Sequence, residues 1–185
     1  MLPWGLNLEF WVFALACLLT APLPAVAQTS REYQIEAVFL FNFAQFTDWP
    51  RDAFASSNSP IVMGILSANP FGRFLQDTIR DELVRGRRIE IRHYRAVEEI
   101  KTCHILYISQ SEATRLDHIL AGLKGKSVLT VSDIEHAAIR GVMIRFLTER
   151  NKIRLRVNLA AVKAARLSLS SKLLRGAEIV GAEEQ

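Results

Sequence analysis

Histidine is the side chain most often used to bind metals or to move protons near neutral pH, and this sequence contains four of them. They are His93, His104, His118 and His136. None of them forms an H-x-x-x-H pair, and none has companion cysteines and acids at the spacing of a zinc site. The sequence therefore predicts no dedicated metal site.

Two further stretches carry residue types that could do chemistry. Ser132, Asp133 and His136 are the types of a hydrolase triad, but they lack a G-x-S-x-G elbow, and three polar residues after a strand usually form a loop and a cap. Asn69 to Gly72 forms a strand-to-helix turn of the kind that binds anions, yet it has no G-x-G-x-x-G or G-K-[ST] pattern. We expect neither an enzyme nor a cofactor.

The elements that would position these residues alternate between short apolar strands and helices. We expect helices over 33–47, 69–83 and 112–123, a helical turn over 97–101, and strands over 61–66, 87–94, 105–108 and 128–131. Asn69 suits the N-cap of the second helix, with Pro70 at its first position and Leu83 on its apolar side. Such alternation predicts one α/β domain with three layers, α/β/α, and a mostly parallel sheet.

The chain beyond Asp133 has a different pattern. Residues 142–148 and 153–157 read as two strands around a turn near Arg150 and Asn151, so an antiparallel hairpin should finish the sheet. Asn158 is expected to cap a helix through Ala165, and Ser170 a last helix that carries Leu173, Leu174 and Ile179.

A two-residue turn fixes which side chains of this hairpin share a face. Glu149 then faces Lys152, Phe146 faces Leu155, and Ile144 faces Val157. The core face holds Ile144, Phe146, Ile153, Leu155 and Val157, and the outer face holds Arg145, Leu147, Lys152, Arg154 and Arg156.

On the outer face, Arg145 lies opposite Arg156, a like-charge pair that an acidic partner surface would relieve. Arg145, Leu147, Arg154 and Arg156 are therefore predicted to bind a partner; the alternative is a solvated face that protects the sheet edge.

The helix over 33–47 is apolar on more than one side and ends before Trp49 and Pro50. Ile35, Phe39, Phe43 and Phe46 recur at helical spacing and are expected in the core. Trp49 precedes a proline at a corner of the fold, where part of a large ring usually stays exposed. We predict that Trp49 belongs to a recognition surface.

The N-terminus has the pattern of an export signal. An apolar run from Phe10 to Ala21 precedes Ala25-Val26-Ala27, which suits cleavage before Gln28. We expect a signal peptide at 1–27 and the folded domain at 28–185; an uncleaved anchor is the alternative, because the first ten residues carry no Lys or Arg. Residues 1–27 contain one acid, so their removal raises the net charge from +4 to +5, too little to predict nucleic-acid binding.

Export places the domain in an oxidising compartment, where paired cysteines are common. Cleavage would remove Cys17 and leave Cys103 alone, so no intramolecular disulfide is predicted. Cys103 lies at the edge of an apolar strand and is expected to be a small buried residue.

Five stretches in this order resemble the YfiR-like family of small periplasmic proteins. They are Y-Q-I-E-A-V-F-L-F-N-F-A-Q-F-T-D-W-P at 33–50, N-P-F-G at 69–72, C-H-I-L-Y-I-S at 103–109, V-L-T-V-S-D at 128–133, and I-R-L-R-V-N-L-A-A-V-K-A-A-R-L-S-L-S-S-K-L-L-R at 153–175. The resemblance implies a non-enzymatic regulator that binds the periplasmic part of a membrane-anchored diguanylate cyclase and represses it. It also implies a cysteine just before N-P-F-G that would pair with Cys103, and the candidate positions here hold Met63 and Gly64.

Other partners stay open at this point. The alternative function is a periplasmic small-molecule binding module that uses a cleft beside Trp49 and the carboxyl ends of the strands. A homodimer is the other partner considered.

Overall fold

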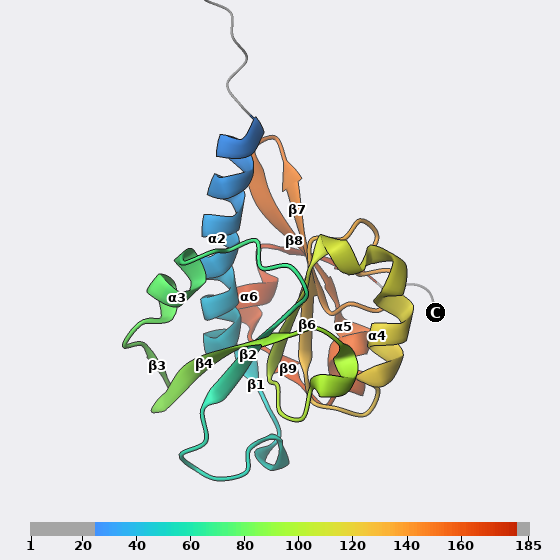
Figure 1. Ribbon diagram of the computed structural model, residues 1–185. Helices are drawn as coiled ribbons and strands as arrows, with labels where there is room; N and C mark the ends of the chain where they lie inside the picture. The colour runs from blue at the N-terminus through green and yellow to red at the C-terminus, as the bar shows by residue number, and fades with distance from the viewer. Residues whose placement is uncertain (1–24, 181–185) are drawn as a thin grey trace, which may run out of the picture.

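In the computed structural model, residues 25–180 are described, and they form a mixed α/β domain around one large sheet (Figure 1). The sheet has eight strands in the order β10-β8-β7-β6-β5-β2-β4-β3. Their bounds are β2 (Ile61–Leu66), β3 (Leu83–Val84), β4 (Arg87–Tyr94), β5 (Ile105–Ile108), β6 (Leu129–Ser132), β7 (Ile144–Glu149), β8 (Lys152–Asn158) and β10 (Ala177–Val180). All neighbours are parallel except β3 with β4 and β7 with β8. The predicted fold class is confirmed.

Helices cover both faces of this sheet. They are α2 (Ala25–Phe46), α3 (Phe74–Ile79), α4 (Leu116–Gly122), α5 (Leu159–Ala164) and α6 (Ser171–Leu174), with 3-10 turns η2 (Arg51–Ala53), η3 (Val97–Glu99) and η4 (Gln110–Arg115). One core lies between the sheet and α2 with α3, and a second lies between the sheet and α4 (Figure 1). Among residues 25–180, no helix is both long enough and apolar enough to span a bilayer.

The long helix α2 ends at Phe46, as the sequence predicted, and the chain then enters the two-residue strand β1 (Thr47–Asp48). β1 pairs with β9 (Ser168–Leu169), which ties the end of α2 to the C-terminal region. The buried face of α2 differs from the predicted one. It holds Glu36, Ala37, Leu40, Phe43 and Ala44, whereas Ile35 is 42% exposed.

The helix predicted over 69–83 is shorter than expected. The turn at Asn69 does form, because the Asn69 side chain accepts a hydrogen bond from the Phe71 N–H at 3.0 Å, but α3 begins only at Phe74. It ends at Ile79, since Asp81 adopts a left-handed φ of 60° that a helix cannot continue. Leu83 therefore lies in the edge strand β3, and its side chain is 56% exposed.

The end of the chain holds the largest correction. The helix that Ser170 caps stops at Leu174, and Ile179 lies in β10, a strand that runs parallel to β8. The hairpin of β7 and β8 has the predicted register, with Arg145 opposite Arg156. Within the sheet, however, β10 pairs with the other edge of β8. The hairpin is therefore not the edge of the sheet.

Candidate functional site

The predicted partner-binding residues lie at two opposite ends of the sheet. Arg145 is opposite Ser132, the last residue of β6, so β7 and β8 extend beyond the carboxyl ends of the parallel strands. Trp49 instead contacts His104, which directly precedes β5 at the amino ends. Figure 1 shows β7 and β1 at opposite ends of the molecule. Trp49 and the hairpin therefore belong to two separate surfaces.

The outer face of the hairpin presents the side chains that the alternation predicted. Arg154 is exposed, and Arg145, Leu147 and Arg156 are half-buried. Arg156 donates to the Glu178 carboxylate of β10 at 2.8 Å, so an acid of the same chain relieves its repulsion with Arg145. Glu178 was expected inside the last helix, so this ion pair was not predicted from the sequence.

Trp49 is half-buried and its polar group is in use. The indole N–H donates to the His104 carbonyl at 3.2 Å, and the ring meets Phe54 and His104 edge to face. The His104 side chain is 1% exposed and stacks on Phe54 at 4.4 Å. The Arg87 guanidinium lies over the Phe54 ring, 4.0 Å from its centroid. The sequence placed His104 in a strand motif and gave no sign of this stack.

A buried polar cluster at the carboxyl ends was also missed. Tyr33 of α2 donates to Asp133 at 3.0 Å, and Glu36 and Tyr107 lie next to them. Glu36 is 4% exposed, and no hydrogen-bond partner is found for its Oε2 atom or for the Tyr107 hydroxyl within residues 25–180. Burial first, and then the Asp133 and Glu32 carboxylates, raise the pKa of Glu36 to about 9. Glu36 is thus neutral at pH 7.

The pKa values of two neighbouring groups, Asp133 and Tyr33, are raised as well. Burial raises the pKa of Asp133 despite the Tyr33 hydrogen bond and the positive charge of Arg145. Burial and the Asp133 charge also raise the pKa of Tyr33. A sequence signal for the cluster existed, since Glu36 lies three residues after Tyr33 and four before Leu40, on the buried side of α2.

Ser132, Asp133 and His136 do not form a triad. The Ser132 hydroxyl donates to the Ile108 carbonyl at 2.8 Å, Asp133 is bound to Tyr33, and His136 faces Glu135 in solvent. Within the described part of the chain, no three His, Cys, Asp or Glu side chains are grouped to hold a metal ion.

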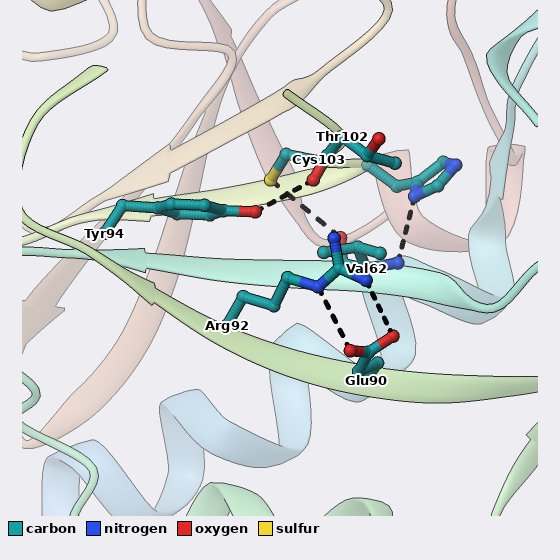
Figure 2. Close-up of polar contacts among 7 residues, drawn as sticks. Val62, Glu90, Arg92, Tyr94, Thr102 and Cys103 are labelled. Atoms are coloured by element: carbon teal, nitrogen blue, oxygen red, sulfur yellow. Dashed lines mark hydrogen bonds and ion pairs between the residues drawn. The ribbon is translucent and has the colours of Figure 1, made fainter. Parts of the chain in front are cut away.

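Cys103 is a buried free thiol among polar contacts of β2 and β4 (Figure 2). Its sulfur donates to the Ile105 carbonyl at 3.0 Å, and burial raises the pKa of the thiol to about 12. A Cβ atom added at Gly64 would lie 2.9 Å from the Cys103 sulfur. Gly64, rather than Met63, therefore occupies the position that faces Cys103.

Replacing Cys103 with serine is expected to lower the midpoint of thermal unfolding by only a few degrees, as a change of at most about 1 kcal/mol would. The reason is that the thiol has no disulfide partner among residues 25–180 and a serine hydroxyl can use the same carbonyl. Thermal unfolding should be the same with and without reductant. A loss of about 10 °C or more would show that Cys103 has another partner.

Comparison with known protein families matches residues 33–178 to the family described as YfiR/HmsC-like. The match begins at Tyr33 in α2 and ends at Glu178 in β10, so it spans both surfaces described above. A search of curated proteins finds no match.

Proposed function

Because the chain belongs to the YfiR/HmsC-like family, whose YfiR-like members are periplasmic regulators of diguanylate cyclases, we propose that it binds the periplasmic part of a membrane-anchored diguanylate cyclase and holds it inactive. The family match is the observation that carries this proposal. YfiR-like proteins are regulatory rather than catalytic. Repression requires only that the chain favour the inactive arrangement of the cyclase over the active one, which lowers the production of cyclic di-GMP.

The location follows from the same proposal. The signal peptide that we predict at 1–27 lies almost wholly outside the described residues, and its cleavage before Gln28 would leave the domain free in the periplasm. The net charge of +5 that remains after cleavage is compatible with a partner that stands close to an anionic membrane surface.

The outer face of the hairpin is the contact that we favour. Arg145, Leu147 and Arg154 leave cationic and apolar groups at the surface, and Arg154 forms no ion pair with a carboxylate of residues 25–180. An acidic and partly apolar partner surface would complement them. Trp49 would make a second, separate contact, with its indole N–H already bound to His104.

Reversing a charge on this face should slow association with the cyclase domain. We expect Arg154→Glu combined with Leu147→Ala to reduce the association rate by about tenfold at low salt and to flatten its salt dependence. Circular dichroism should stay unchanged, and the midpoint of thermal unfolding should fall by only a few degrees, since Arg154 is exposed and Leu147 is half-buried. The measurement is surface plasmon resonance against the purified periplasmic domain.

Arg95→Glu is the matched control, because Arg95 is exposed and directly follows β4. In the sheet, β6, β5 and β2 separate β4 from the hairpin. Arg95→Glu makes the same change in net charge and should leave the kinetics near those of the parent. Equal kinetics for the hairpin variant and the parent would assign this face to solvent.

A second candidate function rests on one observation, an open cavity of about 470 Å³ beside Trp49. Arg51, Phe54, Ser56, Ser57 and Arg87 line it with Trp49. The cavity lies at the amino ends of the parallel strands, whereas the sequence predicted a cleft beside Trp49 and the carboxyl ends. A small-molecule module would bind its ligand here with no cyclase present.

A further inference from the structure

His104 uses both ring nitrogens inside the protein, and only one protonation state satisfies both contacts. Its Nδ1 atom accepts a hydrogen bond from the Val62 N–H at 2.9 Å, so this nitrogen carries no proton. Its Nε2 atom lies 3.1 Å from the Ala53 carbonyl and must donate to it. The contacts therefore fix the neutral imidazole in one tautomer.

These contacts hold the segment from Trp49 to Phe54 in place. The bond to Ala53 attaches η2, and the stack on Phe54 attaches the residue that follows it. Trp49 is bound to the backbone of His104 itself through its indole N–H. His104 thus joins the segment from Trp49 to Phe54 to the amino ends of β2 and β5.

A second proton on His104 would turn the acceptor at Nδ1 into a donor that faces the Val62 N–H. Burial already disfavours the charged ring and lowers the pKa of His104, and the guanidinium groups of Arg87 and Arg92 from β4 lower it further. Of the charged residues in η2, Asp52 is 2.8 Å from Arg166 and is not paired with the ring. Among residues 25–180, no carboxylate forms an ion pair with the His104 ring or contributes to its pKa.

We propose that His104 is an acid-sensitive positioning residue, whose protonation releases the segment from Trp49 to Phe54 and with it the Trp49 contact to the partner. The part concerning the partner rests on the proposed function. The sign is fixed by the direction of the shift. The pKa of His104 is lowered in the state in which the segment from Trp49 to Phe54 is held. His104 therefore stabilises that state above its ordinary pKa of about 6.5, and this stabilisation is lost as the pH falls toward the lowered pKa.

The release can be tested on the isolated protein, without any cyclase. Trp4 and Trp11 are replaced by phenylalanine in the full chain, so that Trp49 is the one remaining tryptophan. Between pH 7.5 and 4.5, the Trp49 emission should move to longer wavelength, and the protection of the Val62 amide against hydrogen exchange should fall by about tenfold or more. The midpoint should coincide with that of the His104 ring proton in an NMR titration.

His104→Asn removes the titration together with the bond to Ala53 and the stack on Phe54, so its Trp49 emission should lie at the longer wavelength of the acid form throughout this range. His93→Asn is the matched control, because His93 is exposed in β4 and its loss should leave the transition of the parent intact. A ring that titrates with no change in Trp49 emission, or an unaltered transition in His104→Asn, would overturn the proposal.

The partner is tested separately by binding to the cyclase domain at pH 7.5 and pH 5. Loss of binding at pH 5 in the parent, with weak binding of His104→Asn at both pH values, is the expected result. Absence of binding at pH 7.5 would count against the proposed function alone, because the emission experiment does not depend on it.

Discussion

Replacing Glu36 with glutamine is expected to stabilise the protein at pH 8 by roughly 2 to 5 kcal/mol. Glu36 is 4% exposed on the buried side of α2, and its pKa in the folded protein is about 9 against an ordinary value of 4.5. The folded state therefore keeps a proton that the unfolded state releases. Glutamine fills nearly the same volume and has no proton to lose.

The sign of the pH dependence follows from this difference. Between pH 4.5 and pH 9 the folded protein binds more protons than the unfolded chain, so the free energy of unfolding of the parent should fall as the pH rises. In Glu36→Gln this decline should be much smaller.

Chemical denaturation at pH 5 and pH 8 measures both effects. Glu82→Gln is the matched control, because Glu82 is exposed and is not among the groups that raise the pKa of Glu36. A Glu36→Gln protein no more stable than the parent at pH 8 would contradict the assignment of a neutral, buried carboxyl.

Replacing Phe43 with alanine is expected to cost about 3 to 5 kcal/mol and to lower the unfolding midpoint by about 10 °C or more. Phe43 is 1% exposed, and its ring stacks on Phe146 at 5.6 Å between centroids. Phe39 contacts both rings, so the cavity would lie at the junction of α2 and β7. Phe39 and Phe146 also contact each other, which limits how far these rings can move to fill it.

Val38→Ala serves as the control on the same helix, because Val38 is 48% exposed and its truncation removes few contacts. We expect it to change the free energy of unfolding by less than about 0.5 kcal/mol. Similar losses for Phe43→Ala and Val38→Ala would mean that α2 does not bury the face described here.

Much of this fold follows from local pattern, because the elements that were predicted well carry their own signals. The strand over Ile61–Leu66 is a continuous apolar run, and the register of the hairpin follows from its alternation and short turn. β10 was missed because only four residues pair with β8, and a pairing between distant strands leaves no periodic mark in the sequence.

The candidate surfaces were predicted less completely for the same reason. The exposure of Arg154 follows from alternation within one strand, whereas the ion pair of Arg156 with Glu178 depends on β10. The stack of His104 on Phe54 joins residues fifty positions apart in sequence. Hydrophobic patterning indicates which side of an element is buried, but it does not indicate which buried polar groups meet there.

The most direct test of the account is the recovery of a cyclase with the tagged chain from a cross-linked envelope fraction of its native host, identified by mass spectrometry. The Arg154→Glu, Leu147→Ala variant provides the matched control for specific capture. We expect a membrane-anchored protein with a diguanylate cyclase domain to be enriched with the parent and depleted with the variant. Recovery of no such cyclase, or equal recovery with both proteins when the cyclase is expressed, would contradict repression through the hairpin face.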